Sequence, residues 1–188
     1  MNGNVNPYIF PVSRIGNAKN PKLVILMNNP GRSPENINEM AESRMNFKNP
    51  NDSIDKIIFS EYRKECDWWD KLLEHFDPYF DDKDILSMEY YMYHTKDSKG
   101  VPKKKDWKKE AIEQLEINKS LLYDAMNRKI PIFAYYYGVW IDECHELLEY
   151  PYYSPCINHY NPAIKRNYLK NVIIPDWEKR KVIQKIKS

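Results

Sequence analysis

The sequence is poor in glycine and cysteine and has no long hydrophobic run. Its 188 residues include five Gly and three Cys, while 42% are hydrophobic and 30% are charged. This balance excludes a collagen-like chain, an intrinsically disordered chain and a small disulfide-rich scaffold. No apolar stretch approaches the roughly 20 residues that a membrane-spanning helix needs. The N-terminal sequence MNGNVNPYIF also lacks the features of a signal peptide, so we expect a soluble, cytoplasmic protein.

Few residues are available for binding a metal ion. Cys66, Cys144 and Cys156 are scattered without a CxxC pair, which excludes a four-cysteine zinc or iron–sulfur site. The four His add no better pattern, because His145 and Glu146 begin only half of an HExxH sequence. We therefore predict no metal and no cofactor.

Overall charge gives little information on the partner. The 29 Lys and Arg nearly balance the 27 Asp and Glu, for a net charge of +2, so a polyanion would have to bind to a local patch. The length predicts a single domain over residues 1–188. A chain of this size buries about 70% of the surface that it would expose when unfolded.

Strand-like and helix-like patterns alternate along the chain. Residues 21–27 (PKLVILM) form a continuous apolar run, which is typical of a strand buried on both faces. Further strands are predicted at 84–93, 130–137 and 150–153. Helices are predicted at 33–44, 66–76, 103–127, 139–148, 162–171 and 176–187. The alternation predicts an α/β fold, with three α/β/α layers around a central, mostly parallel four-stranded sheet.

In such a sheet, ligands bind beyond the carboxyl ends of the strands. The segments predicted to lie there are 28–33, 89–95, 138–140 and 152–161. These four segments are where we expect a functional site.

Short motifs in these segments and elsewhere along the chain resemble those of the uracil-DNA glycosylase superfamily. Residues 23–31 (LVILMNNPG) are similar to the family's first motif, a strand ending in Gly-x-Asn/Asp-Pro, in its Asn-Pro-Gly version. Residues 152–155 (YYSP) fall where the family has His-Pro-Ser-Pro, and 167–169 with 174–177 resemble its closing motifs. The resemblance implies the family's fold and a monomeric, monofunctional DNA glycosylase. Such an enzyme hydrolyses the N-glycosidic bond of a flipped pyrimidine in single- or double-stranded DNA, in repair or in defence against foreign DNA, without a cofactor.

Three positions depart from the family's pattern. Met27 replaces a Gly, Glu89 stands where most members have Asn, and Tyr152 stands where many have His. Each change falls at the pocket expected for the base.

Asn29 is the residue expected to position the attacking water. The glycosidic bond breaks as the base leaves as an anion and the sugar becomes cation-like, so a water must be held at the sugar. Pro30 fixes Asn29 at the end of a strand, where its amide oxygen can orient that water. The alternative is a turn Asn that bonds its own backbone. We expect Asn28, Pro30 and Gly31 to bind the substrate beside it.

Donation to the leaving base is expected from residues 152–161. The candidates are the phenol of Tyr152, His159 and the backbone amides near Ser154. Ser154 is also a candidate for binding a DNA phosphate, and Asn161 is a candidate for binding the substrate. The alternative for His159 is a loop residue without a role.

Glu89 is the residue expected to select the base. An Asn offers uracil one donor and one acceptor, whereas an ionised Glu only accepts and suits an amino group such as N4 of cytosine. This predicts a preference for cytosine, in a modified form, over uracil. The alternatives are an exposed Glu at a strand end and a match with the family's motif that is displaced by one residue. The aromatic residue that stacks on the base is not specified by the pattern, and Phe47 and Tyr93 are candidates.

A basic run precedes the helix predicted at 103–127. Lys103, Lys104, Lys105 and Lys108 lie where the helix dipole disfavours cations, so we expect them to bind DNA phosphates. The alternative is a solvated charged surface.

Two other functions stay open. One is a non-catalytic member of the same fold that binds nucleic acid or protein, which the departures from the family's pattern permit. The other is a small-molecule enzyme, which is disfavoured because the sequence has no Gly-rich phosphate loop and no Rossmann fingerprint.

Overall fold

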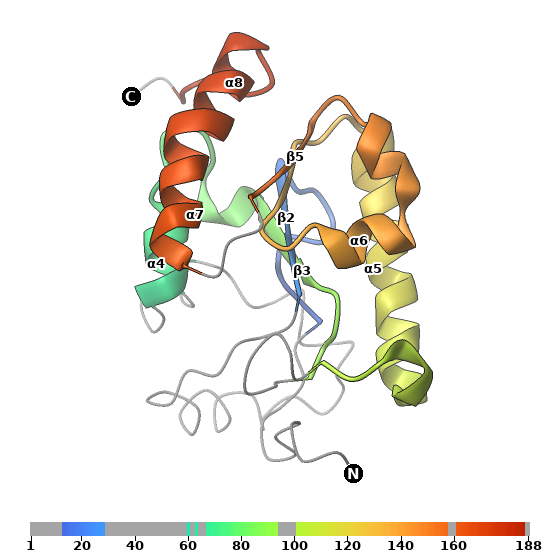
Figure 1. Cartoon of the computed structure of the whole chain (residues 1–188). Coiled ribbons are helices and arrows are strands. Elements are labelled where there is room, and N and C mark those ends of the chain that lie inside the picture. Colours follow the sequence, from blue (N-terminus) through green and yellow to red (C-terminus); the bar gives the residue numbers. More distant parts are fainter. Residues whose placement is uncertain are drawn as a thin grey trace.

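The computed structural model describes residues 13–28, 60, 63, 67–93, 101–157 and 161–186. Several predictions fall outside these residues and stay predictions, namely the roles of Asn29, Pro30, Gly31, Phe47 and His159 and the helix at 33–44. The described part of the chain has one sheet between two groups of helices (Figure 1). It is therefore an α/β structure, as predicted.

The sheet has five strands in the order β1-β3-β2-β4-β5. They are β1 (Arg14–Gly16), β2 (Leu23–Met27), β3 (Ile85–Glu89), β4 (Ile132–Ala134) and β5 (Tyr153–Pro155). Strands β2 to β5 are parallel, whereas β1 pairs with β3 in the antiparallel sense. The mostly parallel sheet is confirmed, but the predicted number of four strands is wrong. Strand β1 was not predicted from the sequence, because it has only three residues and begins with an Arg.

Strand β2 lies in the middle of the sheet, and all five of its residues are buried. Its side chains alternate between two hydrophobic cores, one on each face of the sheet. A strand that is covered on both faces has to be apolar throughout. This explains why the run at 21–27 is continuous and why the strand was easy to predict.

In the described part of the chain, three helices cover one face of the sheet (Figure 1). They are α4 (Asp67–Leu73), α7 (Pro162–Tyr168) and α8 (Ile174–Lys179), and a π-helical segment, η6 (Leu169–Ile173), joins α7 directly to α8. Lys165, Leu169, Ile173 and Trp177 are buried along this continuous helical stretch. The stretch thus keeps one side against the sheet from α7 to α8.

Two helices cover the other face (Figure 1). The long helix α5 (Lys109–Asn127) buries one stripe of its surface, and α6 (Gly138–Glu143) buries Trp140 completely. Helices on both faces of a mostly parallel sheet are compatible with the predicted three-layer α/β/α class.

Several predicted boundaries are wrong. Helix α5 begins at Lys109 and not at 103, because residues 104–106 form a separate turn. The helical stretch ends at Lys179 and not at 187, and Lys181 has a positive φ of 58°. The predicted strand 150–153 is displaced, since β5 begins at Tyr153. Among the described residues, the short 3-10 helices are η2 (Asp82–Asp84), η4 (Lys104–Asp106) and η5 (His145–Glu149).

Ser154 ties β5 to the helical layer. It is buried in the middle of the strand, where its Oγ accepts a hydrogen bond from Trp177 Nε1 at 2.6 Å. The indole of Trp177 is itself completely buried, so Ser154 satisfies a donor that water cannot reach.

We expect Ser154→Ala to lower the free energy of unfolding by about 1–3 kcal/mol, because it leaves the buried N–H of Trp177 without an acceptor. Urea unfolding measures the loss. A double-mutant cycle with Trp177→Phe separates the hydrogen bond from the packing of the ring. A Ser154→Ala protein as stable as the wild type would contradict this account of the contact.

Candidate functional site

The carboxyl ends of β2, β3 and β4 meet at one edge of the sheet. The chain passes from β2 to its neighbour β3 on one side and then to β4 on the other side, so the strand order reverses between β2 and β4. In open α/β sheets, ligands bind at such a reversal, beyond the carboxyl ends of the strands. The residues around the ends of β2, β3 and β4 are therefore the first candidates for a site.

Hydrogen bonds hold the end of β2 in place. Met27 O accepts from Tyr90 N at 3.1 Å and from Trp140 Nε1 of α6 at 2.6 Å. Asn28 follows directly and is buried, and its carbonyl oxygen accepts from Tyr91 N at 2.8 Å. The backbone is thus supported from β3 and from α6 up to Asn28, the first predicted substrate-binding residue.

Glu89 is the last residue of β3 and lies beside Met27 in the parallel register. It is only 4% exposed, and among the described residues its Oε2 has no hydrogen-bond partner. Burial raises the pKa of Glu89 well above its usual value, because a carboxylate there loses its hydration and gains no partner in return. The alternative of an exposed Glu at a strand end is therefore wrong, and burial opposes the ionised form that the sequence analysis assumed.

Lys165 of α7 reaches the end of β4. Its Nζ donates to Tyr135 O at 2.8 Å and lies 4.2 Å and 3.9 Å from the ring centroids of Tyr135 and Tyr136. Lys165 is only 4% exposed, and burial lowers the pKa of its amine. The two ring faces and the carbonyl oxygen act in the opposite direction, because each stabilises the ammonium form.

We refer to Asn28, Glu89, Tyr136 and Lys165 as the carboxyl-edge site. Tyr136 is half-buried, and its pKa is raised by burial and by the charge of Glu89, which connects the two groups electrostatically. Neighbouring strands lie about 4.8 Å apart, so the backbones at the ends of β3 and β4 are separated by roughly 10 Å across β2. The site combines an acid, an aromatic face and a cation.

Two members of this site, Tyr136 and Lys165, were missed by the sequence analysis. The predicted strand 130–137 is too long, and this placed Tyr136 inside the strand and not beyond its end at Ala134. A helical signal for Lys165 was present, because Leu169 and Ile173 follow it at spacings of four residues on the buried side.

Tyr152, a predicted catalytic residue, lies at the opposite end of the sheet. It precedes β5, and its carbonyl oxygen accepts from Ile132 N at the start of β4, at 2.9 Å. The prediction assumed that the strand ends at residue 153, whereas it begins there. This displacement moves Tyr152 from the carboxyl end to the amino end of β5, roughly 10 Å along the strand.

Ser154 has a structural partner in place of the predicted phosphate, and Asn161 caps a helix. The hydroxyl of Ser154 accepts from Trp177 Nε1 inside the core, which is incompatible with gripping a DNA phosphate from the same position. Asn161 is the N-cap of α7, because its Oδ1 accepts from Ala163 N at 2.9 Å. Ser154 therefore does not belong to the carboxyl-edge site, whereas substrate binding by Asn161 stays a prediction.

The two described cysteines are not activated. Cys144 and Cys156 are buried free thiols, and burial raises the pKa of both. A nucleophilic cysteine requires a lowered pKa, so these two have the properties of core residues.

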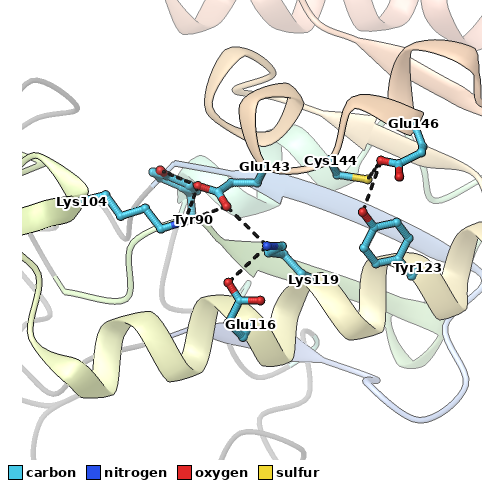
Figure 2. Close-up of polar contacts among 8 residues, drawn as sticks. All are labelled: Tyr90, Lys104, Glu116, Lys119, Tyr123, Glu143, Cys144 and Glu146. Carbon is cyan, nitrogen blue, oxygen red and sulfur yellow. Dashed lines mark hydrogen bonds and ion pairs between the residues drawn. The ribbon is translucent and has the colours of Figure 1, made fainter.

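The predicted phosphate-binding lysines lie ahead of α5, and all four are exposed. Lys104 is nevertheless engaged, because its Nζ lies 2.6 Å from Glu143 Oε1 (Figure 2). Lys119 contacts the same carboxylate at 3.5 Å, and Tyr90 OH donates to it at 3.4 Å. Burial by itself would raise the pKa of Glu143, but the two lysines outweigh burial and lower it.

Lys104 therefore has a structural role that the sequence analysis did not consider, joining η4 to α6 through Glu143. Lys108 lies 5.4 Å from the ring centroid of Tyr93, one of the two aromatic residues proposed for stacking. For Lys103, Lys105 and Lys108, phosphate binding stays a prediction.

A cavity of about 470 Å³ lies away from the carboxyl edge. It is lined by the turns that follow α4 and by η6 and α8, among them His75, Tyr79, Lys170 and Glu178. Tyr79 OH donates to Glu178 Oε1 at 2.8 Å, and burial lowers the pKa of His75. None of the predicted site residues lines this cavity.

Within the residues that the structure describes, no three His, Cys, Asp or Glu side chains come together as metal ligands. In the same part of the chain, every helix is too short or too polar to cross a membrane.

Comparisons of the chain with models of protein families, with curated proteins and with solved structures found no match. Function therefore has to be inferred from the carboxyl-edge site and from the sequence motifs.

We expect Lys104→Gln to lower the free energy of unfolding at pH 7 by no more than about 1 kcal/mol, because the Lys104 side chain is 41% exposed. The lysines lower the folded pKa of Glu143, so their contribution is present above the unfolded pKa of about 4.3 and is lost as the pH falls through the folded value. Urea unfolding at pH 7 and at pH 3 measures the loss of unfolding free energy and its dependence on pH. Lys105→Gln is the matched control, and equal losses in the two variants would contradict the pairing.

Proposed function

We propose that this protein is a DNA glycosylase of the uracil-DNA glycosylase superfamily, with that family's fold, which hydrolyses the N-glycosidic bond of a flipped pyrimidine. The observation that carries the proposal is the position of Glu89. It is a buried acid without a hydrogen-bond partner for Oε2 among the described residues, and it lies one strand away from the β2 end that leads into Asn-Pro-Gly. Buried polar groups of this kind are costly and gather at functional sites, where a ligand can complete their hydrogen bonds. The resemblance assigns base reading to this same position.

The other members of the carboxyl-edge site have roles in this proposal. Tyr136 offers a half-buried aromatic face on which the flipped base can stack. The ammonium of Lys165 stabilises the negative charge that develops on the departing base, and a cation in a buried site does this more effectively than one in water. Asn29 orients the attacking water.

The proposal includes the partner and the setting. The partner is DNA, single- or double-stranded, and the excised base is uracil or a modified cytosine, in repair or in defence against foreign DNA. The enzyme acts as a cytoplasmic monomer without a cofactor. Lys103, Lys105 and Lys108 contact phosphates of the DNA backbone.

A non-catalytic binder on the same fold is the second candidate. The observation that favours it is the location of Tyr152 and Ser154 away from the carboxyl edge, since both were expected to help the base to leave. Such a binder retains affinity for DNA but releases no base.

We expect Asn29→Ala to slow base release by about 100-fold or more, because one positioned polar group typically contributes that much. DNA affinity and the free energy of unfolding should stay unchanged. The assay measures free base and alkali-labile abasic sites from oligonucleotides that contain uracil, cytosine or C5-substituted cytosine. Asn171→Ala, which removes an exposed Asn from η6, is the matched control. Undiminished release by a folded Asn29→Ala protein would refute the assignment.

Replacing Lys103, Lys105 and Lys108 together by Gln should weaken DNA binding about equally for all sequences. The slope of log affinity against log salt should flatten by about one for each phosphate that the variant no longer neutralises. Fluorescence anisotropy between low and moderate salt measures the slope. The control is the same change of charge at Lys179, Lys181 and Lys185, which are exposed beyond or at the end of α8. If both triple variants have the wild-type slope, the run is a solvated surface.

A further inference from the structure

Glu89 is a buried acid that forms no ion pair in the described part of the chain. It is 4% exposed, its Oε2 makes no hydrogen bond there, and it forms no ion pair with a described Lys or Arg. An ionised carboxylate in this position would lose its hydration without a compensating cation. A protonated carboxyl group avoids most of this cost, because it carries no charge to desolvate.

Strand β1 and helix α5 offer no free positive charge to Glu89. Arg14 of β1 is paired in register with Met88, the neighbour of Glu89 whose side chain belongs to the core on the α5 side of the sheet. The Arg14 guanidinium donates to Gln114 of α5 at 3.2 Å. Asn118, also of α5, donates its neutral amide to the backbone oxygen of Glu89 at 3.0 Å.

The elements on the other side of Glu89 form no ion pair with it either. Strand β2 contributes the neutral Met27 beside it. The end of β4 contributes Tyr136, a phenol whose pKa is raised by burial and by Glu89. The amine of Lys165 is held by the carbonyl oxygen of Tyr135 and by the two tyrosine rings.

We propose that Glu89 reads the flipped base as a neutral carboxylic acid, donating through its O–H and accepting through its C=O. This inference rests on the function proposed above and specifies how the base is recognised. A neutral carboxyl group presents one donor next to one acceptor, the same pair that an Asn amide presents. It can accept from N3–H of uracil and donate to O4, whereas a carboxylate would face O4 with like polarity.

The inference replaces the preference for cytosine that an ionised Glu89 implies. A neutral Glu89 accepts uracil as an Asn would. It does not penalise cytosine either, because N4–H and N3 of cytosine are also an adjacent donor and acceptor. Uracil release should therefore be robust at a pH where Glu89 is protonated and should decline as the residue ionises.

The substitution Glu89→Gln distinguishes a role for the neutral carboxylic acid from a role for the charged carboxylate. Gln carries one donor group and one acceptor at every pH, so we expect single-turnover release of uracil within about threefold of the wild-type maximum, without the wild type's decline as the pH rises. Glu89→Ala removes both hydrogen bonds and should be slower by about 10-fold or more. A role for the charged carboxylate predicts instead that Glu89→Gln is as slow as Glu89→Ala, and this result would overturn the inference.

The dependence of stability on pH tests the neutral acid without using activity. The folded pKa of Glu89 is raised, so its contribution to stability is complete below the unfolded pKa and is lost as the pH rises through the folded value. Between about pH 5 and pH 8 the unfolding temperature of the wild type should therefore fall relative to that of Glu89→Gln. Glu143→Gln is the matched control with the opposite sign of pH dependence. The wild type should have a higher unfolding temperature than Glu143→Gln at pH 8 and lose that difference at low pH. A constant difference between the wild type and Glu89→Gln would overturn the inference.

The two proposals fail in different ways. If the wild type releases no base from any oligonucleotide, the proposed function fails and base reading by Glu89 fails with it, while the stability series still decides whether Glu89 is neutral. If base is released and Glu89→Ala is as fast as the wild type, the glycosylase stands and the role of Glu89 is refuted.

Discussion

The pairing of β2 with β3 on one edge and with β4 on the other is the constraint on which the site depends. This pairing brings together three strand ends that are far apart in the sequence, and its register sets which side chains share a face. Glu89 lies beside Met27, on the face that α4 and α7 cover. A slip of one residue would turn Glu89 toward α5, because side chains alternate strictly along a strand. The identity of the site is therefore a property of the register as much as of the residues.

Both helical layers reach the strand ends with long side chains that donate to backbone carbonyl groups. Trp140 extends from α6 to Met27 O, and Lys165 extends from α7 to Tyr135 O. At the end of a strand, carbonyl groups lose their ladder partners and must find others when they are buried. Each donor buries its apolar part in the core while it satisfies one of these oxygens. The two layers thus support the carboxyl-edge site from opposite faces of the sheet.

The sequence predicted the elements whose pattern has a single physical explanation. A continuous apolar run indicated β2, and the alternation of strands with helices indicated the parallel sheet. Short elements were predicted poorly, because three residues such as those of β1 or β5 carry too little periodicity to define a boundary. The same limitation determined which residues of the site could be predicted correctly. Glu89 was recognised because the resemblance assigns base reading to its position, which lies in a strand that the sequence predicted, whereas a displacement of a few residues in β5 placed Tyr152 at the wrong end of the sheet. The partners of Lys165 and Lys104 come from remote parts of the chain, and no local pattern could reveal them.

The π-helical segment η6 lets the C-terminal helical stretch contain one residue more than a regular α-helix with the same buried face. The buried positions 165, 169, 173 and 177 recur every four residues, and over this distance a regular α-helix would turn its last position about 120° away from its first. The wider π turn absorbs this rotation and returns Trp177 to the sheet. With one residue fewer, a regular α-helix would bring the same side chain to within about 20° of the same face. Chains of this fold can therefore differ by one residue between α7 and α8 and still keep the contact of Trp177 with β5.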